Sequence, residues 1–411
     1  MSRHRKGAAR APARSAPSDR VSRLPGYGIV DQVQFAGYAA VDMEPVGDGA
    51  GLFYWFVGTQ RYERAPTILW TNGGPGSSSF WGFFLENGPY EIDPSGKKLN
   101  RRAHAWNDYA NYMIFEHPLS VMLSVAPDEA DIPKSVEQGI AQLYRALLNF
   151  MALHPEIACN PIILAGESYA GTYLPLLARE IAQGNQRGLA KLDLRAMVLC
   201  DAWVDPMVQM AMDTTWAFAH GLISSAQKQW LDVCYRDRLP EVNDAIQKLC
   251  GLYMTNTAQT ADPSFDPIYA YLNDPEVRAA LHVPPHYPKM TQNWSKQISD
   301  NYRAHVNDSY LNVVQELLDG GKLAVRVVSG LNDAKDCNFL GTAAWLDRLQ
   351  GNVAYAFQAA RSAQWKDDQG NVIGFVQDGG RLSWLKVMNA GHMAARDQPR
   401  LVRFILDSLK P

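Results

Sequence analysis

The chain alternates between short apolar runs and amphipathic stretches, and this alternation leaves few folds open to it. Residues 67–70, 112–115, 161–165, 194–204 and 323–328 have the composition of buried strands, whereas residues 136–153 repeat apolar side chains at helical spacing. Strands that alternate with helices in this way predict a mostly parallel sheet with helices on both faces. The 411 residues are 47% hydrophobic, which is enough to bury such a sheet and excludes a disordered or collagen-like chain.

Two further segments complete the expected organisation. Residues 34–41 and 51–57 flank a Gly/Asp-rich loop and predict an antiparallel hairpin. Residues 205–320 are mostly helical in pattern and lie between two expected strands, so we interpret them as an inserted helical cap. The predicted division is therefore a basic tail over 1–24, a first part of the core over 25–204, the cap over 205–320 and a second part of the core over 321–411.

The basic tail contains seven Lys or Arg residues and a single acid. It lacks the apolar segment of a secretory signal, so we interpret it as a disordered, solvated tail; a transit peptide is the alternative. The net charge of -3 gives no global basic field for nucleic acid, and no run of about 18 apolar residues predicts a membrane helix. We expect a cytoplasmic protein with neither a nucleic-acid partner nor a membrane anchor, and the oligomeric state stays open.

The turn after residues 161–165 is a candidate nucleophile site. Ser168 stands between a strand and a helix, with the small residues Gly166 and Ala170 around it, as in an elbow that exposes a serine hydroxyl above a sheet. The backbone N–H of Tyr169, at the start of the helix, would point toward a developing oxyanion. The alternative is a serine that only caps the helix.

A glycine-rich loop follows the strand at 67–70. Its two adjacent glycines, Gly73 and Gly74, allow a backbone N–H to approach a ligand closely, and Gly74 is the natural second oxyanion donor. A phosphate loop would need a Lys-Ser or Lys-Thr pair after its last glycine, and this loop has none.

Four segments together resemble the serine carboxypeptidases, a family with an α/β-hydrolase fold. The resemblance runs from about residue 27 to 409 and is carried by Trp70-Thr71-Asn72-Gly73-Gly74-Pro75-Gly76, Gly166-Glu167-Ser168-Tyr169-Ala170-Gly171, Tyr271-Leu272-Asn273-Asp274-Pro275 and Asn389-Ala390-Gly391-His392-Met393. The resemblance implies a serine-type carboxypeptidase that acts on peptides with a free C-terminus and uses no cofactor.

The order of residues along the chain indicates which acid and which histidine act with Ser168. In α/β-hydrolases the acid follows a late strand and the histidine comes last. Asp333 and Asp336 both follow the strand at 323–328, and His392 is the only histidine beyond them. The family pattern places the acid at Asp333 when it is counted from Gly330, so Asp333 is preferred and Asp336 is the fallback. His392 would then take the Ser168 proton while Asp333 holds its tautomer.

The resemblance also implies how the substrate carboxylate is recognised. The family uses an Asn and two Glu residues, and these positions match Asn72, Glu86 and Glu167. Two close carboxyls cannot both ionise, so one retains a proton that can be donated to a carboxylate. We therefore expect peptidase activity to favour acid pH.

The chain departs from the family at several positions. Ser77 replaces a cysteine, and residues 293–298 lack the cysteine that would pair with it, which favours a reducing compartment. Cys234 and Cys250 could pair with each other. No paired-cysteine or paired-histidine spacing predicts a metal site. In the loop 118–125, Ser120 and Met122 replace glycines and Val125 replaces a tyrosine, which predicts a reshaped loop near the active site.

Two other functions compete with the carboxypeptidase. The same fold supports acyltransferases, in which an amine or alcohol intercepts the acyl-enzyme, and the altered loop 118–125 keeps this alternative open. A non-enzymatic scaffold would require a missing member of the triad, and none is missing.

Overall fold

The structure is a computed structural model that describes residues 19–41, 51–335 and 337–407. Most of the basic tail and the fallback acid Asp336 lie outside the described residues. No helix in the described part of the chain is long and apolar enough to span a membrane.

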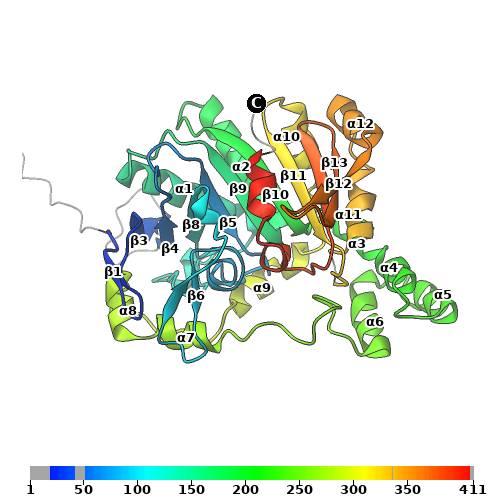
Figure 1. Ribbon diagram of the computed structural model, residues 1–411, viewed down its shortest axis with the longest axis horizontal. Helices are drawn as coiled ribbons and strands as arrows, with labels where there is room; N and C mark the ends of the chain where they lie inside the picture. The colour runs from blue at the N-terminus through cyan, green and yellow to red at the C-terminus, as the bar shows by residue number, and fades with distance from the viewer. Residues whose placement is uncertain (1–18, 42–50, 336, 408–411) are drawn as a thin grey trace, which may run out of the picture.

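A ten-stranded sheet forms the centre of the molecule (Figure 1). Its strands, in spatial order, are β12 (Ser362–Lys366), β13 (Val372–Asp378), β14 (Leu382–Val387), β11 (Ala324–Gly330), β10 (Leu194–Ala202), β9 (Ile162–Ser168), β5 (Thr67–Thr71), β8 (Asn111–Phe115), β4 (Gly51–Val57) and β3 (Gln34–Ala40). The six strands from β14 to β8 run parallel, and the two at each edge are antiparallel. Two small sheets pair β1 (Arg23–Leu24) with β2 (Gly28–Ile29) and β6 (Tyr90–Ile92) with β7 (Leu99–Arg101).

Fourteen α-helices surround the sheet in the described residues. They are α1 (Val136–Leu153), α2 (Ala170–Gln186), α3 (Pro206–Met210), α4 (Asp213–Ala219), α5 (Ser225–Cys234), α6 (Val242–Cys250), α7 (Asp266–Leu272), α8 (Pro275–Ala280), α9 (Lys296–Tyr302), α10 (Leu311–Asp319), α11 (Phe339–Leu346), α12 (Gly351–Ala359), α13 (Ala394–Asp397) and α14 (Leu401–Asp407). A π-helical turn, η1 (Trp81–Glu86), follows the glycine loop.

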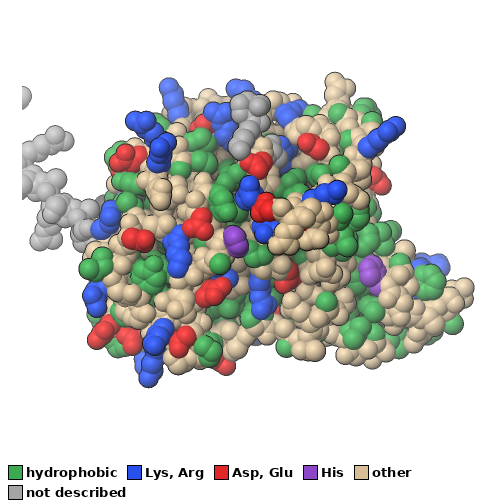
Figure 2. All heavy atoms as spheres, viewed as in Figure 1, with side chains coloured by type: hydrophobic (Ala, Val, Ile, Leu, Met, Phe, Trp, Pro, Cys, Tyr) green, Lys and Arg blue, Asp and Glu red, His purple; other side chains and the backbone are tan. Residues whose placement is uncertain are grey.

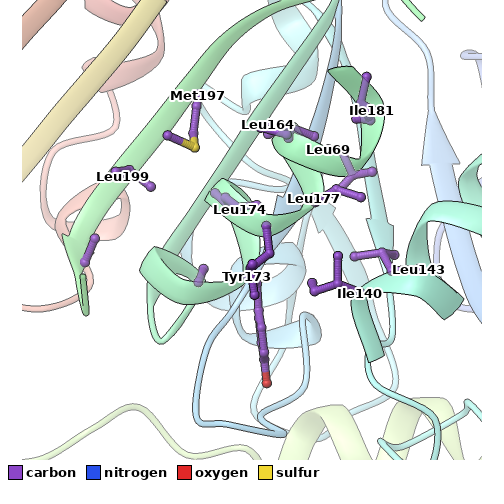
Figure 3. Packing of buried hydrophobic residues seen from close by; sticks show 14 of the residues in the cluster. Leu69, Ile140, Leu143, Leu164, Tyr173, Leu174, Leu177, Ile181, Met197 and Leu199 are labelled. Atoms are coloured by element: carbon purple, nitrogen blue, oxygen red, sulfur yellow. The ribbon is translucent and has the colours of Figure 1, made fainter. Parts of the chain in front are cut away.

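The core has one hydrophobic cluster on each face of the sheet. Successive side chains of β9 point to opposite faces, so Leu164 belongs to one cluster and Ile163 to the other. On the first face α2 packs on β9 and β10, as Figure 3 shows with Leu164 and Leu174, and α1 packs against α2, β3 and β4. On the second face η1, α7, α8, α13 and α14 contribute the buried side chains. The expected α/β architecture with helices on both faces is confirmed.

The helical segment 205–320 does not pack as one body. Helices α4, α5 and α6 project from the core and enclose a third cluster that contains Trp216, Leu231 and Ile246 (Figure 1). Hydrophobic side chains are exposed on this projection (Figure 2), among them Trp230 and Val233. In contrast, α7 and α8 contribute to the cluster on the second face and α10 to that on the first. The domain boundaries drawn from the sequence stay a prediction.

Candidate active site

The candidate residues gather at the carboxyl ends of neighbouring parallel strands. Ser168 ends β9, Asp333 follows β11 and His392 follows β14, while the glycine loop follows β5. Loops at this edge of an open α/β sheet form the usual ligand site because the carboxyl ends of the strands open toward one crevice. Positions that are 165 and 224 residues from Ser168 along the chain are thereby placed in one region.

Ser168 lies on a strained turn. Its φ is 62°, in the left-handed region that non-glycine residues seldom adopt. The turn is tight because a Cβ on Gly166 would lie 2.4 Å from the carbonyl oxygen of Thr71 and 2.7 Å from the Cβ of Ala170. Ser168 is partly exposed, whereas Glu167 and Tyr169 on either side of it are buried. This is the geometry of a nucleophile elbow, in which the turn presents the serine side chain to the crevice.

Asp333 and His392 are in direct contact. The Nδ1 atom of His392 lies 2.7 Å from Oδ2 of Asp333, and Oδ1 of Asp333 accepts a hydrogen bond of 2.9 Å from the backbone N–H of Lys335. The Asp333 side chain is fully buried, whereas 12% of the His392 side chain is exposed. A buried carboxylate at Nδ1 leaves Nε2 as the nitrogen available to accept a proton.

The glycine loop lies directly against the elbow. A Cβ on Gly73 would stand 2.2 Å from the backbone nitrogen of Tyr169, so only glycine fits there. Gly74 has a φ of 111°, which also favours glycine. Within the described chain, the backbone N–H groups of Gly74 and Tyr169 donate no hydrogen bond. They are therefore available to an oxyanion.

Asn72, Glu86 and Glu167 form a buried cluster beside the elbow. The Nδ2 group of Asn72 donates to Oε1 of Glu86 at 2.9 Å and to Oε1 of Glu167 at 3.1 Å. Its Oδ1 accepts hydrogen bonds from Trp70 Nε1 at 2.9 Å and from the backbone N–H of Gly82 at 3.0 Å. Glu86 and Glu167 each have a buried Oε2 atom that has no hydrogen-bond partner among the described residues, although the two carboxyl groups also interact with each other as a hydrogen-bonded pair.

Burial perturbs the titration of both glutamates. Desolvation is the main cause that raises the pKa of Glu86, although the hydrogen bonds to Glu167 and Asn72 lower it. Desolvation followed by the charge of Glu86 raises the pKa of Glu167 well above its ordinary value. The two groups therefore hold at least one proton between them when exposed glutamates have lost theirs.

Two residues of the loop 118–125 have a left-handed backbone conformation. Ser120 and Met122 have φ values of 80° and 46°, both in the left-handed region. The hydroxyl of Ser120 lies 2.5 Å from that of Ser295, which joins the loop to the start of α9. The reshaping of this loop relative to the family stays a prediction.

The cysteine positions carry no disulfide in the described residues. Cys234 and Cys250 are both free thiols, so the pairing considered from the sequence is not formed. Ser77 lies opposite Trp294 in a short antiparallel bridge. Ser78 N–H donates to the carbonyl of Asn293 at 2.8 Å, so backbone hydrogen bonds hold these two segments together.

Two buried acids of this region escaped the sequence analysis. Glu116 accepts hydrogen bonds of 2.8 Å from the Ser78 hydroxyl and the Ser79 backbone, and thereby supports the glycine loop. Asp201 is the second-last residue of β10 and accepts a hydrogen bond of 2.8 Å from the backbone N–H of Gly330. An acid at the end of an apolar strand is the sequence signal that could have identified each.

Comparisons with known proteins agree on one family. The sequence profile described as "Serine carboxypeptidase" matches residues 25–262 and 234–409. "Serine carboxypeptidase-like 50" of Arabidopsis thaliana is 27% identical over 88% of this chain and 84% of its own length. "Pheromone-processing carboxypeptidase kex1" of Pyrenophora tritici-repentis is also 27% identical, over 93% of this chain and 66% of its own length.

A solved structure shares the fold. It is that of Kex1(Δ)p, described as a prohormone-processing carboxypeptidase from Saccharomyces cerevisiae, with a TM-score of 0.80 and 22% identity. The match covers 95% of this chain and 96% of the other. Because the family profile covers nearly all of the described residues and the fold agrees, the chain belongs to the serine carboxypeptidase family.

Proposed function

We propose that this protein removes the C-terminal residue of peptides through an acyl-enzyme formed on Ser168. His392 accepts the proton of the Ser168 hydroxyl as the oxygen attacks the scissile carbonyl, while Asp333 keeps the imidazole oriented. The backbone N–H groups of Gly74 and Tyr169 stabilise the oxyanion. His392 then passes its proton to the leaving amine. A water molecule, deprotonated in the same way, releases the shortened peptide from the serine.

The observation that carries the exopeptidase assignment is the buried cluster of Asn72, Glu86 and Glu167. Both amide hydrogens of Asn72 are engaged with the two glutamates, so its role is to hold them. The donor to the substrate carboxylate is then a proton on an unpartnered Oε2 atom of the pair. Since Glu167 directly precedes Ser168, a carboxylate bound by this pair would lie near the nucleophile, which suits an exopeptidase.

The direct test is mass spectrometry of peptides incubated with the enzyme. Peptides that become shorter by their C-terminal residue support the proposal, whereas intact peptides together with acylated amines or alcohols would favour an acyltransferase. The Ser168→Ala variant should lose both the activity and covalent labelling by a fluorophosphonate probe. Labelling that persisted in this variant would place the nucleophile elsewhere.

We also propose a cytoplasmic location. The contact between residues 76–78 and 293–295 supports it, because backbone hydrogen bonds join these segments at a position where the family has a cysteine and this chain has Ser77. A contact that needs no disulfide suits a reducing compartment. Cell fractionation tests this location, and recovery of the protein from the medium or from an exported fraction would contradict it.

A further inference from the structure

Residues 254–259, which we name the strap, lie between α6 and α7 and contact the loop that carries Asp333. The backbone N–H of Ala334 donates to the carbonyl of Met254 at 2.9 Å, and that of Thr257 donates to the carbonyl of Asn332 at 3.1 Å. These two bonds bracket Asp333 on both sides. The strap is thus hydrogen-bonded to the residue before and the residue after the buried acid.

The same strap also binds the loop that carries His392. The backbone N–H of His392 donates to the carbonyl of Thr255 at 2.8 Å. A Cβ on the preceding Gly391 would lie 2.4 Å from the Cβ of Asn256 and 2.5 Å from the carbonyl oxygen of Thr255. The strap therefore packs against the histidine loop without a gap, and glycine is required at position 391 for this contact.

The carboxylate of Asp397 also connects the strap to the histidine loop, because it accepts hydrogen bonds from both. Its Oδ2 accepts hydrogen bonds of 2.9 Å from both the backbone N–H of Gly391 and the Nδ2 group of Asn256. Its Oδ1 accepts one of 3.2 Å from Nε2 of Gln259. Asn256 is buried, and its Oδ1 accepts the backbone N–H of Ala258, so the amide is held at both ends.

These contacts matter because His392 lies in a segment without regular structure. Strand β14 ends at Val387 and α13 begins at Ala394, so no helix or strand supports the imidazole directly. Its side chain is held to the protein at Nδ1 by Asp333, whose own loop is held by the strap. The strap thus binds both loops, and it adds to the direct hydrogen bond of 2.8 Å from the backbone N–H of Asn332 to the carbonyl of Ala390 that joins the acid loop to the histidine loop.

We propose that Asn256 and Asp397 are positioning residues, which hold the strap against the histidine loop and so set the orientation of His392 toward Ser168. The inference rests on the proposed roles of Ser168 and His392. A displacement of about 1 Å between reacting groups can cost on the order of 100-fold in rate. Loss of the contact between Asn256 and Asp397 should therefore lower kcat more than it weakens substrate binding.

The decisive variant is Asn256→Ala, measured with a peptide substrate and with a fluorophosphonate probe. We expect kcat to fall by about 10- to 100-fold with KM changed by less than about threefold, because the cluster of Asn72, Glu86 and Glu167 is not touched. The rate of Ser168 labelling should fall in parallel. Gln259→Ala removes the longer hydrogen bond to Asp397 and should lower kcat and the labelling rate by a smaller factor. It replaces Asn256→Ala as the test if that variant does not fold.

Asn273→Ala is the matched control. Asn273 also makes two side-chain hydrogen bonds to a loop, at 2.7 and 2.8 Å to the backbone of Met290, but it does not contact the triad loops. It should keep wild-type kcat and labelling rate even where its thermal midpoint falls. Wild-type kcat and labelling in folded Asn256→Ala and Gln259→Ala would overturn the inference, as would equal losses in Asn273→Ala. Ser168→Ala that is still labelled would instead overturn the proposed function.

Discussion

The carboxyl groups of Glu86 and Glu167 share the two amide hydrogens of Asn72, and each keeps one buried oxygen without a partner. Desolvation raises the pKa of both groups, and the charge of Glu86 raises that of Glu167 further. A raised carboxyl pKa keeps its proton at acid pH and loses it as the pH rises. Binding of a substrate carboxylate should therefore weaken toward alkaline pH, through loss of a donor and through charge repulsion.

Glu167→Gln tests this pair. The amide supplies a neutral donor that does not titrate, so kcat/KM for a free-acid peptide should fall less steeply above neutral pH than in the wild type, even if its value at acid pH is lower. The measurement is a pH–rate profile with free-acid and C-terminally amidated peptides, and the amidated peptide should respond much less to the substitution. Glu276→Gln, an exposed position on α8, is the control. Unchanged profiles in both Glu167→Gln and Glu86→Gln would mean that another group binds the carboxylate.

Asp333 is the acid that the structure places against His392. Its carboxylate is buried and lies 2.7 Å from His392. Asp333→Asn should lower kcat by about 10⁴-fold, because an amide opposite Nδ1 favours the wrong imidazole tautomer. Asp336→Asn should change kcat by less than about threefold. Steady-state kinetics of the two variants decide between them, and the reverse order would reassign the acid.

The contact between the glycine loop and the elbow joins two elements that are almost a hundred residues apart. Residue 73 can carry no side chain, because its Cβ would stand 2.2 Å from the backbone nitrogen of Tyr169 and 2.8 Å from the carbonyl oxygen of Glu167. Both neighbours are backbone atoms and cannot rotate away. The oxyanion donors, the elbow and the glutamate cluster therefore form one tightly packed unit.

Gly73→Ala should disturb this unit as a whole. We expect the rate of fluorophosphonate labelling to fall by more than about 100-fold, because the methyl group must push the loop from the elbow and displace the oxyanion donors. Gly320→Ala is the control, since a Cβ there lies 3.4 Å from its nearest neighbour, the carbonyl of Glu316. It should leave the labelling rate unchanged. A labelling rate near wild type in Gly73→Ala would show that the loop can move without harm to the site.

The stability of the protein as a function of pH reflects two neighbouring buried groups. Desolvation raises the pKa of Glu116 from 4.5 to about 8, although hydrogen bonds from Ser78 and Ser79 oppose the shift. The folded chain thus holds a proton that the unfolded chain releases above pH 4.5, and stability is lost as the pH rises toward 8. Desolvation lowers the pKa of His117 from 6.5 to about 3, so its effect has the opposite sign and stability is lost below pH 6.5.

Glu116→Gln should flatten the alkaline side of this profile. Between pH 6.5 and 8 one proton accounts for up to about 1.4 kcal/mol of unfolding free energy per pH unit, and the amide removes that dependence. Its oxygen can still accept the bond from the Ser79 backbone, and its NH2 group can donate to the Ser78 hydroxyl. Chemical denaturation across pH 5 to 9 measures the slope. His117→Asn should change the profile only below pH 6.5. A Glu116→Gln profile parallel to that of the wild type would show that Glu116 does not titrate in this range.

Much of the architecture follows from local patterns in the sequence. The helix predicted over 136–153 is α1 with the same bounds, and the predicted hairpin is the antiparallel pair β3 and β4. These elements were predictable because their apolar periodicity reflects a buried face that the final fold retains. The antiparallel edge strands β12 and β13 were not predicted. The side chains of β12 are mostly exposed, so no apolar pattern marks that strand, whereas β13 begins with the apolar run 372–376 and was missed.

Short motifs in the sequence were enough to predict the fold class, the family and the nature of each candidate group, because the residue types in these motifs are chemically required. The sequence favoured Asp333 over Asp336 only through counting along a motif, and it did not reveal the strap, Glu116 or Asp201. Those roles arise from contacts between residues far apart in the chain, such as Asn256 with Asp397, 141 positions apart. A residue's burial and its partners are properties of the folded packing, so only the three-dimensional arrangement could assign them.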